Sequence, residues 1–253
     1  MKKIIRAITS FLFIWLAVST GLYLLSGTII YKTGLSRNES FSVPHERIFI
    51  RNSAGEKIDT LWAPKSGGAA RKTYLYLHGN AGRLPFIVEG LASHGNLLAP
   101  AYPGFSGSEG SPDTDNINEI LDLSIEFLRA KGIGDKDIVV FGHSLGGSPA
   151  VHAAGRYPDL GRVILVNTFY SIKSMCEGKY YIFCVFAGGI HDSAAMAPLA
   201  KAPVRQFHDR DDLVVPFEEG ERLFDLIGSP DKKFTVIHGS HSDFDVGGII
   251  STD

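Results

Sequence analysis

A serine flanked by glycines stands between a predicted strand and a predicted helix. The Gly-x-Ser-x-Gly run at 142–146 follows an apolar segment rich in β-branched residues, which is typical of a buried strand. An alanine-rich run follows at 148–154, and its Pro149 suits the first turn of a helix. A tight strand-to-helix bend exposes a serine hydroxyl, and the two glycines avoid a Cβ that would collide with the neighbouring strand or helix. The pattern predicts a nucleophile at Ser144.

The base that such a serine needs is expected late in the chain. A serine hydroxyl attacks well only when a base takes its proton and a carboxylate orients that base. Without these partners, the run at 142–146 would be only a turn of small residues. His238 ends an apolar, strand-like run, whereas His241 lies beyond a Gly-Ser pair in a predicted loop. A loop can bring a ring over Ser144, so we predict that His241 is the base and that His238 makes a structural hydrogen bond.

The acid is expected after an earlier strand. Three aspartates follow the predicted strand at 203–208: Asp209, Asp211 and Asp212. One of them would orient the base, and the others would lie in a solvated turn, one of them paired with Arg210. A metal site that combines His208 with the aspartates is an alternative, but the spacing fits no metal-binding motif that we know. The residues alone leave the choice among the aspartates open, and we expect no metal and no cofactor.

The elements that would position these side chains alternate between strands and helices. Strand-like runs cover 45–51, 57–63, 72–77, 96–101, 137–141, 162–166, 203–208 and 232–238, and helix-like runs cover 117–131, 148–157 and 217–227. A turn at 52–55 would join the first two strands as a hairpin. This order predicts an α/β fold with a mostly parallel central sheet and helices on both faces. Active sites in such sheets gather beyond the carboxyl ends of the strands, where every candidate side chain lies.

The N-terminal region differs from the rest in composition. Three basic residues precede a run over 7–31 that is apolar and carries no charge. About 20 such residues span a bilayer as a helix, and a buried core helix is less typical of a run this long. A signal peptide cleaved near 17–19 is an alternative, but the apolar run continues past that point and favours an uncleaved anchor. We therefore predict an N-terminal transmembrane helix in an anchor or signal segment at 1–35, and a catalytic domain at 40–253.

Charge and cysteine content limit the remaining classes of function. Basic residues are slightly more frequent before the apolar run than after it, which predicts a single-pass membrane protein with an extracytoplasmic catalytic domain. The net charge of the 253 residues is −2 and no basic stripe is present, so nucleic-acid binding has no support. There is no Cys-x-x-Cys motif, so neither a zinc site nor a thioredoxin-like site is indicated. A short run of small residues at 66–70 is a candidate linker.

The segment 169–199 is unusually apolar and holds both cysteines. It is either a lid or acyl-binding wall near the membrane, or an ordinary crossover helix with a core face. Cys176 and Cys184 can form a disulfide only if the domain is extracytoplasmic and the chain bends between them. On a regular helix, eight residues would separate them by about 12 Å, which exceeds the reach of a disulfide. Gly178 is the candidate for such a bend.

Five motifs, in this order along the chain, resemble those of the α/β-hydrolase superfamily. They are His78-Gly79-Asn80, the loop 102–110, the run 142–147, Asp212-x-x-Val215-Pro216 and Gly239-x-His241. Within the superfamily, the chain is most similar to membrane-anchored serine hydrolases, namely the Bem46-like proteins and the α/β-hydrolase domain-containing proteins 13 and 17. The resemblance implies the α/β-hydrolase fold, with Ser144 as nucleophile, Asp212 as acid and His241 as base.

The resemblance also implies an oxyanion hole and shows two departures. The backbone N–H groups of Asn80 and Leu145 correspond to those that stabilise the oxyanion in relatives. Asp209 stands where relatives usually have glycine, so the acid loop is expected to differ in shape. Only twelve residues follow His241, where relatives carry a longer closing helix.

The expected activity is that of a serine hydrolase that cleaves carboxylic esters or thioesters through an acyl-enzyme. The substrate would be a lipid, an acylated protein or a small acyl ester. Two alternatives use the same scaffold: a membrane-tethered binding protein without catalytic activity, and a serine peptidase or amidase.

Overall fold

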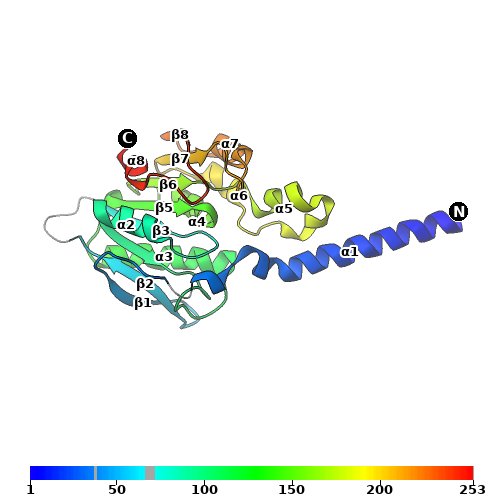
Figure 1. Ribbon diagram of the computed structural model, residues 1–253, viewed down its shortest axis with the longest axis horizontal. Coiled ribbons are helices and arrows are strands. Elements are labelled where there is room, and N and C mark those ends of the chain that lie inside the picture. The colour runs from blue at the N-terminus through cyan, green and yellow to red at the C-terminus, as the bar shows by residue number, and fades with distance from the viewer. Residues whose placement is uncertain (37–38, 66–71, 253) are drawn as a thin grey trace.

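The structure is a computed structural model in which residues 1–36, 39–65 and 72–252 are described, so the candidate linker at 66–70 lies outside them. A single eight-stranded sheet forms the centre of the domain, in the order β1-β2-β4-β3-β5-β6-β7-β8 (Figure 1). The strands are β1 (Glu46–Arg51), β2 (Lys57–Ala63), β3 (Thr73–Leu77), β4 (Asn96–Pro100), β5 (Ile138–His143), β6 (Arg162–Val166), β7 (Val204–Asp209) and β8 (Lys232–Ile237).

The sheet is parallel from β4 to β8, as the alternation of elements predicted. Two pairs of neighbouring strands are antiparallel: β1 with β2, and β2 with β4. They form the predicted hairpin, in which Gly55 adopts φ +80° and donates its N–H to the Asn52 carbonyl oxygen. The central strands β3, β5 and β6 are almost fully buried, which explains their continuous apolar sequences.

Helices cover both faces of the sheet and create two apolar cores. One core packs α3 (Thr114–Ala130), α4 (Gly147–Arg156) and α7 (Phe217–Leu226) against the sheet. The other lies under α2 (Pro85–His94) and α8 (Val246–Ser251). Asp113 caps α3 by accepting a hydrogen bond from the Asn116 N–H (2.7 Å). Helices α2 and α8 were not predicted from the sequence.

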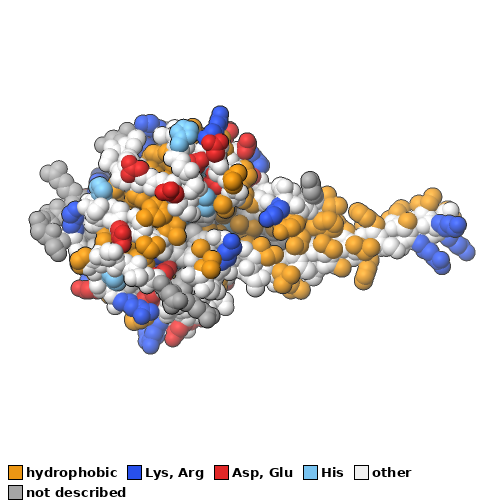
Figure 2. All heavy atoms as spheres, in the orientation of Figure 1, with side chains coloured by type: hydrophobic (Ala, Val, Ile, Leu, Met, Phe, Trp, Pro, Cys, Tyr) orange, Lys and Arg blue, Asp and Glu red, His pale blue; other side chains and the backbone are white. Residues whose placement is uncertain are grey.

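The N-terminal helix α1 (Lys2–Ile30) projects away from the domain (Figure 1). Together with the 3₁₀ turn η1 (Thr33–Ser36), it belongs to a stretch that is long and apolar enough to cross a membrane, and almost none of it is buried. Figure 2 shows hydrophobic side chains along its length and basic side chains at its free end. Within α1, all of which is described, Ser19 is the only buried residue. By length and composition, this is one candidate transmembrane helix.

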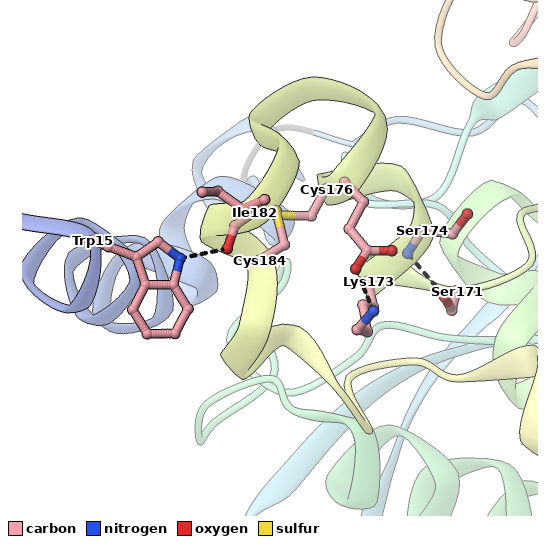
Figure 3. The surroundings of a disulfide bond; sticks show 8 residues. Trp15, Ser171, Lys173, Ser174, Cys176, Ile182 and Cys184 are labelled. Atoms are coloured by element: carbon pink, nitrogen blue, oxygen red, sulfur yellow. Dashed lines mark hydrogen bonds and ion pairs between the residues drawn. A yellow bond between two sulfur atoms is a disulfide. The ribbon is translucent and has the colours of Figure 1, made fainter. Parts of the chain in front are cut away.

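A second projection lies beside α1. It consists of α5 (Ile172–Tyr180) and the 3₁₀ helix η4 (Tyr181–Ala187), and a disulfide joins Cys176 to Cys184, with their Cα atoms 5.8 Å apart (Figure 3). We call residues 172–187 the stapled segment. The helical axis breaks at Tyr180, not at Gly178 as we expected, and this break brings the cysteines together. α5 has no fully buried residue, but its Ile172 and Met175 are partly buried and pack against the core, so both predicted interpretations of this segment stay open. The short helices α6 (Ser193–Met196) and η5 (Ala197–Leu199) lead back to β7.

Candidate active site

Ser144 lies at the sharp bend between β5 and α4. Its φ of +53° falls in the left-handed region, which side chains other than glycine rarely adopt, so the bend is strained. A Cβ at Gly146 would overlap the Leu77 carbonyl oxygen, and a Cβ at Gly142 would overlap the Ala150 side chain. The bend is therefore possible only because both positions lack a Cβ, as the sequence predicted. Thr168 Oγ1 donates a hydrogen bond to the Ser144 carbonyl oxygen (2.8 Å) and holds the bend in place.

Ser144, His241 and Asp212 form one continuous hydrogen-bonded chain. Ser144 Oγ lies 2.9 Å from His241 Nε2, and His241 Nδ1 lies 2.7 Å from Asp212 Oδ2. The three residues follow β5, β8 and β7, whose carboxyl ends meet at one edge of the sheet. The Asp212 side chain is completely buried, whereas the His241 side chain remains 13 % exposed. A ligand can therefore reach the serine and the imidazole but not the carboxylate.

The loop after β7 keeps the Asp212 carboxylate ionised. Burial by itself raises the pKa of Asp212, but hydrogen bonds from His241 and from the Val214 and Val215 backbone N–H groups outweigh it. The net effect holds the pKa below its usual value. An ionised Asp212 accepts a hydrogen bond from Nδ1–H of His241, which keeps the proton on Nδ1 and leaves Nε2 free to accept the proton of Ser144.

The other residues of this loop have structural roles. The buried Asp209 accepts a hydrogen bond from the Asp211 N–H (2.7 Å). Arg210 lies over the Phe217 ring, 4.6 Å from its centroid, so our expectation that it pairs with an aspartate is wrong. His208 Nε2 donates to the Val215 carbonyl oxygen (3.0 Å). Across the described ranges, no group of three or more His, Cys, Asp or Glu residues could hold a metal ion.

Two residues that the sequence analysis did not single out hold the loop of His241. His143 Nε2 donates to the His241 carbonyl oxygen (2.8 Å), and Asn167 Nδ2 donates to the carbonyl oxygens of Ser240 and His241 (3.2 and 3.0 Å). Burial, assisted by nearby His241, lowers the pKa of His143 to about 4, so its ring stays neutral near pH 7. Asn167 could have been found from the sequence, because it directly follows β6 and so lies at the same edge of the sheet as Ser144 and His241.

His238 does not take part in this arrangement. β8 ends at Ile237, so His238 lies just outside the strand and is exposed. In the part of the chain that is described, its ring makes no hydrogen bond, so the predicted structural bond is wrong.

Asn80 and Leu145 line the same cavity as Ser144. Leu145 belongs to η3 (Ser144–Gly146), the first turn before α4, where backbone N–H groups lack partners within the helix. Asn80 lies in the loop after β3, and its carbonyl oxygen accepts a hydrogen bond from the Lys32 N–H (2.9 Å). The segment directly after α1 thus fixes the peptide that carries Asn80.

A cavity of about 290 Å³ opens above Ser144. Its walls come from α1, from the stapled segment and from the loops that follow β3, β5, β6 and β7. Apart from Lys32 and Lys179, the lining residues are apolar or uncharged. A cavity with a serine hydroxyl at its base and apolar walls can accept a molecule that carries a hydrocarbon group.

Comparisons with known proteins agree with this geometry. Residues 74–242 match a family model described as "Alpha/beta hydrolase family". Protein bem46 of Schizosaccharomyces pombe is 30 % identical over 236 residues, which cover 84 % of this chain and 78 % of that protein. α/β-Hydrolase domain-containing protein 17B of Xenopus tropicalis is 26 % identical over 209 residues, which cover 80 % of this chain and 71 % of that protein.

Two solved structures have a similar fold. Esterase Pf2001 of Pyrococcus furiosus has a TM-score of 0.65 and 20 % identity, and the match covers 79 % of this chain and 85 % of that one. Est1E of Butyrivibrio proteoclasticus, with bound ferulic acid, has a TM-score of 0.67 and 17 % identity, and the match covers 81 % of this chain and 98 % of that one.

Proposed function

Because the chain belongs to the α/β-hydrolase family, we propose that it is a serine hydrolase that cleaves carboxylic esters or thioesters. The observation that carries the proposal is the unbroken hydrogen-bonded chain from Ser144 through His241 to Asp212. That chain supplies the nucleophile, the base and the orienting carboxylate that acyl transfer needs. Of the two solved structures, Pf2001 is an esterase and Est1E holds bound ferulic acid, which is consistent with this chemistry.

The reaction proceeds in two halves. His241 Nε2 takes the Ser144 proton as Oγ attacks the substrate carbonyl, and the resulting tetrahedral oxyanion accepts hydrogen bonds from the Asn80 and Leu145 N–H groups. The carbon–oxygen or carbon–sulfur bond breaks, His241 returns the proton to the leaving alcohol or thiol, and an acyl-Ser144 ester remains. Water then attacks that ester with His241 as base, which releases a carboxylic acid and restores the Ser144 hydroxyl.

A kinetic comparison of single variants tests the activity. We expect the purified protein to hydrolyse p-nitrophenyl acetate, and we expect Ser144→Ala to lower kcat by about 10⁴-fold or more. Ser148→Ala is the matched control, because this serine lies one turn further along α4, and it should retain the wild-type rate. Equal hydrolysis by wild-type protein and Ser144→Ala would contradict the proposal, as would a well-folded wild-type protein that cleaves no ester. The latter result would instead favour a binding protein without catalytic activity.

We also propose that α1 is an uncleaved, single-pass anchor and that the domain is extracytoplasmic. Three observations support this arrangement: the length and exposure of α1, the basic residues at its free end, and the disulfide between Cys176 and Cys184. The test is alkylation of denatured but unreduced protein from isolated membranes that have been washed with carbonate. Retention in the pellet at the full-length mass, with no alkylated cysteine, is expected. Release by carbonate, loss of the N-terminal residues, or two alkylated thiols would contradict the arrangement.

A further inference from the structure

The candidate anchor forms part of the cavity above Ser144. Residues from the last three turns of α1 line it: Ser19, Leu22, Tyr23, Ser26, Ile29 and Ile30. Their spacing of three and four residues places them on one face of the helix. From Ser19 to Ile30 the helix rises by about 16 Å, so the wall is long compared with a small acyl group. Ser19, although it lies in an apolar helix, is only 1 % exposed.

Four contacts fix this face of α1 against the domain. Lys32 N–H binds the Asn80 carbonyl oxygen, and the Tyr31 hydroxyl lies 2.8 Å from His191 Nε2 in a buried site. Further along the helix, the rings of Tyr23 and Phe186 meet edge to face, with centroids 6.2 Å apart. Nearer the free end, Trp15 Nε1 donates to the Ile182 carbonyl oxygen (2.9 Å; Figure 3). From Trp15 onward the chain is therefore held against the domain, while the N-terminal half of α1 projects free, so the helix does not act only as a tether.

The stapled segment turns an apolar surface outward beside α1. Tyr180, Ile182, Val185 and Phe186 are each more than a third exposed. Because Ile182 contacts Trp15, this surface lies level with the middle of α1. In a bilayer whose hydrocarbon core spans about 20 helical residues, side chains at this level meet acyl chains and not water. The exposed rings of Tyr23 on α1 and Phe186 on the stapled segment contact each other, so the apolar surfaces of the two elements adjoin. Both rings also line the cavity that contains Ser144.

We propose that the substrate is a long-chain acyl ester of a membrane lipid, whose acyl chain lies between α1 and the stapled segment. This inference rests on the proposed function, because it identifies the acyl group that Ser144 receives. The chain enters from the bilayer along α1, and its ester carbonyl reaches Ser144 at the inner end of the cavity. The helix is thus a wall of the substrate site, and hydrolysis releases a long-chain fatty acid beside the membrane from which the lipid came.

A pair of tryptophan substitutions on α1 tests the proposal. Ser26 lines the cavity, so Ser26→Trp should fill it, whereas Leu24 is 74 % exposed and Leu24→Trp should not. With full-length protein in phosphatidylcholine vesicles, we expect Ser26→Trp to lower kcat/KM for p-nitrophenyl palmitate by about tenfold or more. Leu24→Trp should stay within about twofold of wild type on both esters. In Ser26→Trp the ratio of kcat/KM for palmitate to that for p-nitrophenyl acetate should fall by about tenfold or more, because a two-carbon acyl group does not need the outer part of the cavity. Equal effects on both substrates, or no effect on palmitate, would overturn the proposal.

A binding measurement separates this proposal from the proposed function. In Ser144→Ala, which cannot form an acyl-enzyme, a palmitate analogue with a photoreactive diazirine should cross-link to residues 19–30 and to the stapled segment. Ser26→Trp in the same background should reduce that cross-linking, and Leu24→Trp should not. Cross-linking confined to other parts of α1 would overturn the acyl site even if ester hydrolysis were intact. Cross-linking at the expected residues in a protein whose wild type cleaves no ester would retain the acyl site and reject the hydrolase.

A second substrate decides where the acyl chain comes from. The same vesicles are supplied either with a monopalmitoyl glycerol ester or with an S-palmitoyl peptide. Preference for the glycerol ester, lost in Ser26→Trp, supports the membrane lipid. Exclusive cleavage of the peptide thioester would overturn the assignment to a lipid.

Discussion

Two parts of the chain meet in one cavity beside Ser144, and they are held in different ways. The edge of the sheet is buried, and each of its reacting groups is fixed by at least one hydrogen bond from another loop. The wall formed by α1 and the stapled segment is largely exposed. It is held together by the Tyr23–Phe186 ring contact, the Trp15–Ile182 hydrogen bond and one disulfide. From this difference we expect the proposed chemistry to depend on the packed sheet, and the proposed choice of acyl chain to depend on the exposed wall.

The largest expected effect concerns the Asp212 carboxylate. In Asp212→Asn, the amide no longer stabilises the His241 tautomer that accepts the Ser144 proton, and we expect kcat for p-nitrophenyl acetate to fall by about 10⁴-fold. Asp211→Asn is the matched control, because Asp211 is exposed and contributes only its backbone N–H. Steady-state kinetics on both proteins checks this prediction. Similar rates for the two variants would show that the edge of the sheet is not organised as described.

A smaller effect is expected from Asn167, which touches no reacting atom. Asn167→Ala removes two hydrogen bonds to the backbone of the His241 loop and leaves a non-glycine residue at φ +50°. A displacement of about 1 Å at a catalytic group can cost about 10²-fold in rate, and we expect a loss of that order in kcat. The measurement is kcat for acetyl and palmitoyl esters, which should fall in parallel because both use His241. A selective loss on palmitate would place Asn167 in the acyl wall instead.

The disulfide should affect only the wall. Replacing Cys176 and Cys184 together by serine removes the disulfide that closes this short loop. In the chain-entropy model, its loss lowers the free energy of unfolding by about 2 kcal/mol. We expect the palmitoyl ester to lose its advantage over the acetyl ester, while acetyl hydrolysis is retained. Hydrogen exchange over residues 172–187, followed in the same double variant, should become faster. Loss of acetyl hydrolysis would mean that the wall and the edge of the sheet are not independent.

The smallest effect is a change in pH dependence at the edge of the sheet. His78 Nδ1 donates to the Gly79 carbonyl oxygen and Nε2 accepts from the Tyr102 N–H, and burial lowers its pKa to about 3. Between about pH 6.5 and pH 3 the unfolded chain binds this proton and the folded chain does not, so folding stability falls as the pH falls through that range. His78→Gln should reduce the slope of the unfolding free energy by about 1.4 kcal/mol per pH unit near pH 5. Denaturant titrations of wild type and His78→Gln over this pH range in detergent check the prediction, and equal slopes for the two proteins would contradict it.

The sequence predicted the edge of the sheet well because its signals are local. The glycines beside Ser144, the apolar strands and the polar residues at the strand ends each constrain their own neighbourhood, and the parallel order then brings the strand ends together. Choosing Asp212 among three aspartates needed the resemblance to a family. The structure adds the reason, since the Val214 and Val215 N–H groups turn the Asp212 carboxylate toward His241.

The sequence could offer an acyl-binding wall at 169–199 only as one of two alternatives, because the position of this segment beside α1 depends on contacts between distant residues. Trp15 and Ile182 are 167 residues apart, and nothing near either residue indicates the other. The break at Tyr180 was misplaced at Gly178 because glycine permits a bend but does not cause one. Helix α2 was missed because its apolar residues give no clear helical period, and α8 because it has only six residues.

The most direct test of the central claim is to locate the nucleophile chemically. The full-length protein in native membranes is treated with a fluorophosphonate, digested and analysed by tandem mass spectrometry. We predict one adduct on Ser144, with its rate of formation greatly reduced in Asp212→Asn and unchanged in Asp211→Asn. An adduct on another serine, or labelling of Ser144 at the same rate in all three proteins, would contradict the claim that Ser144, His241 and Asp212 act as one catalytic unit.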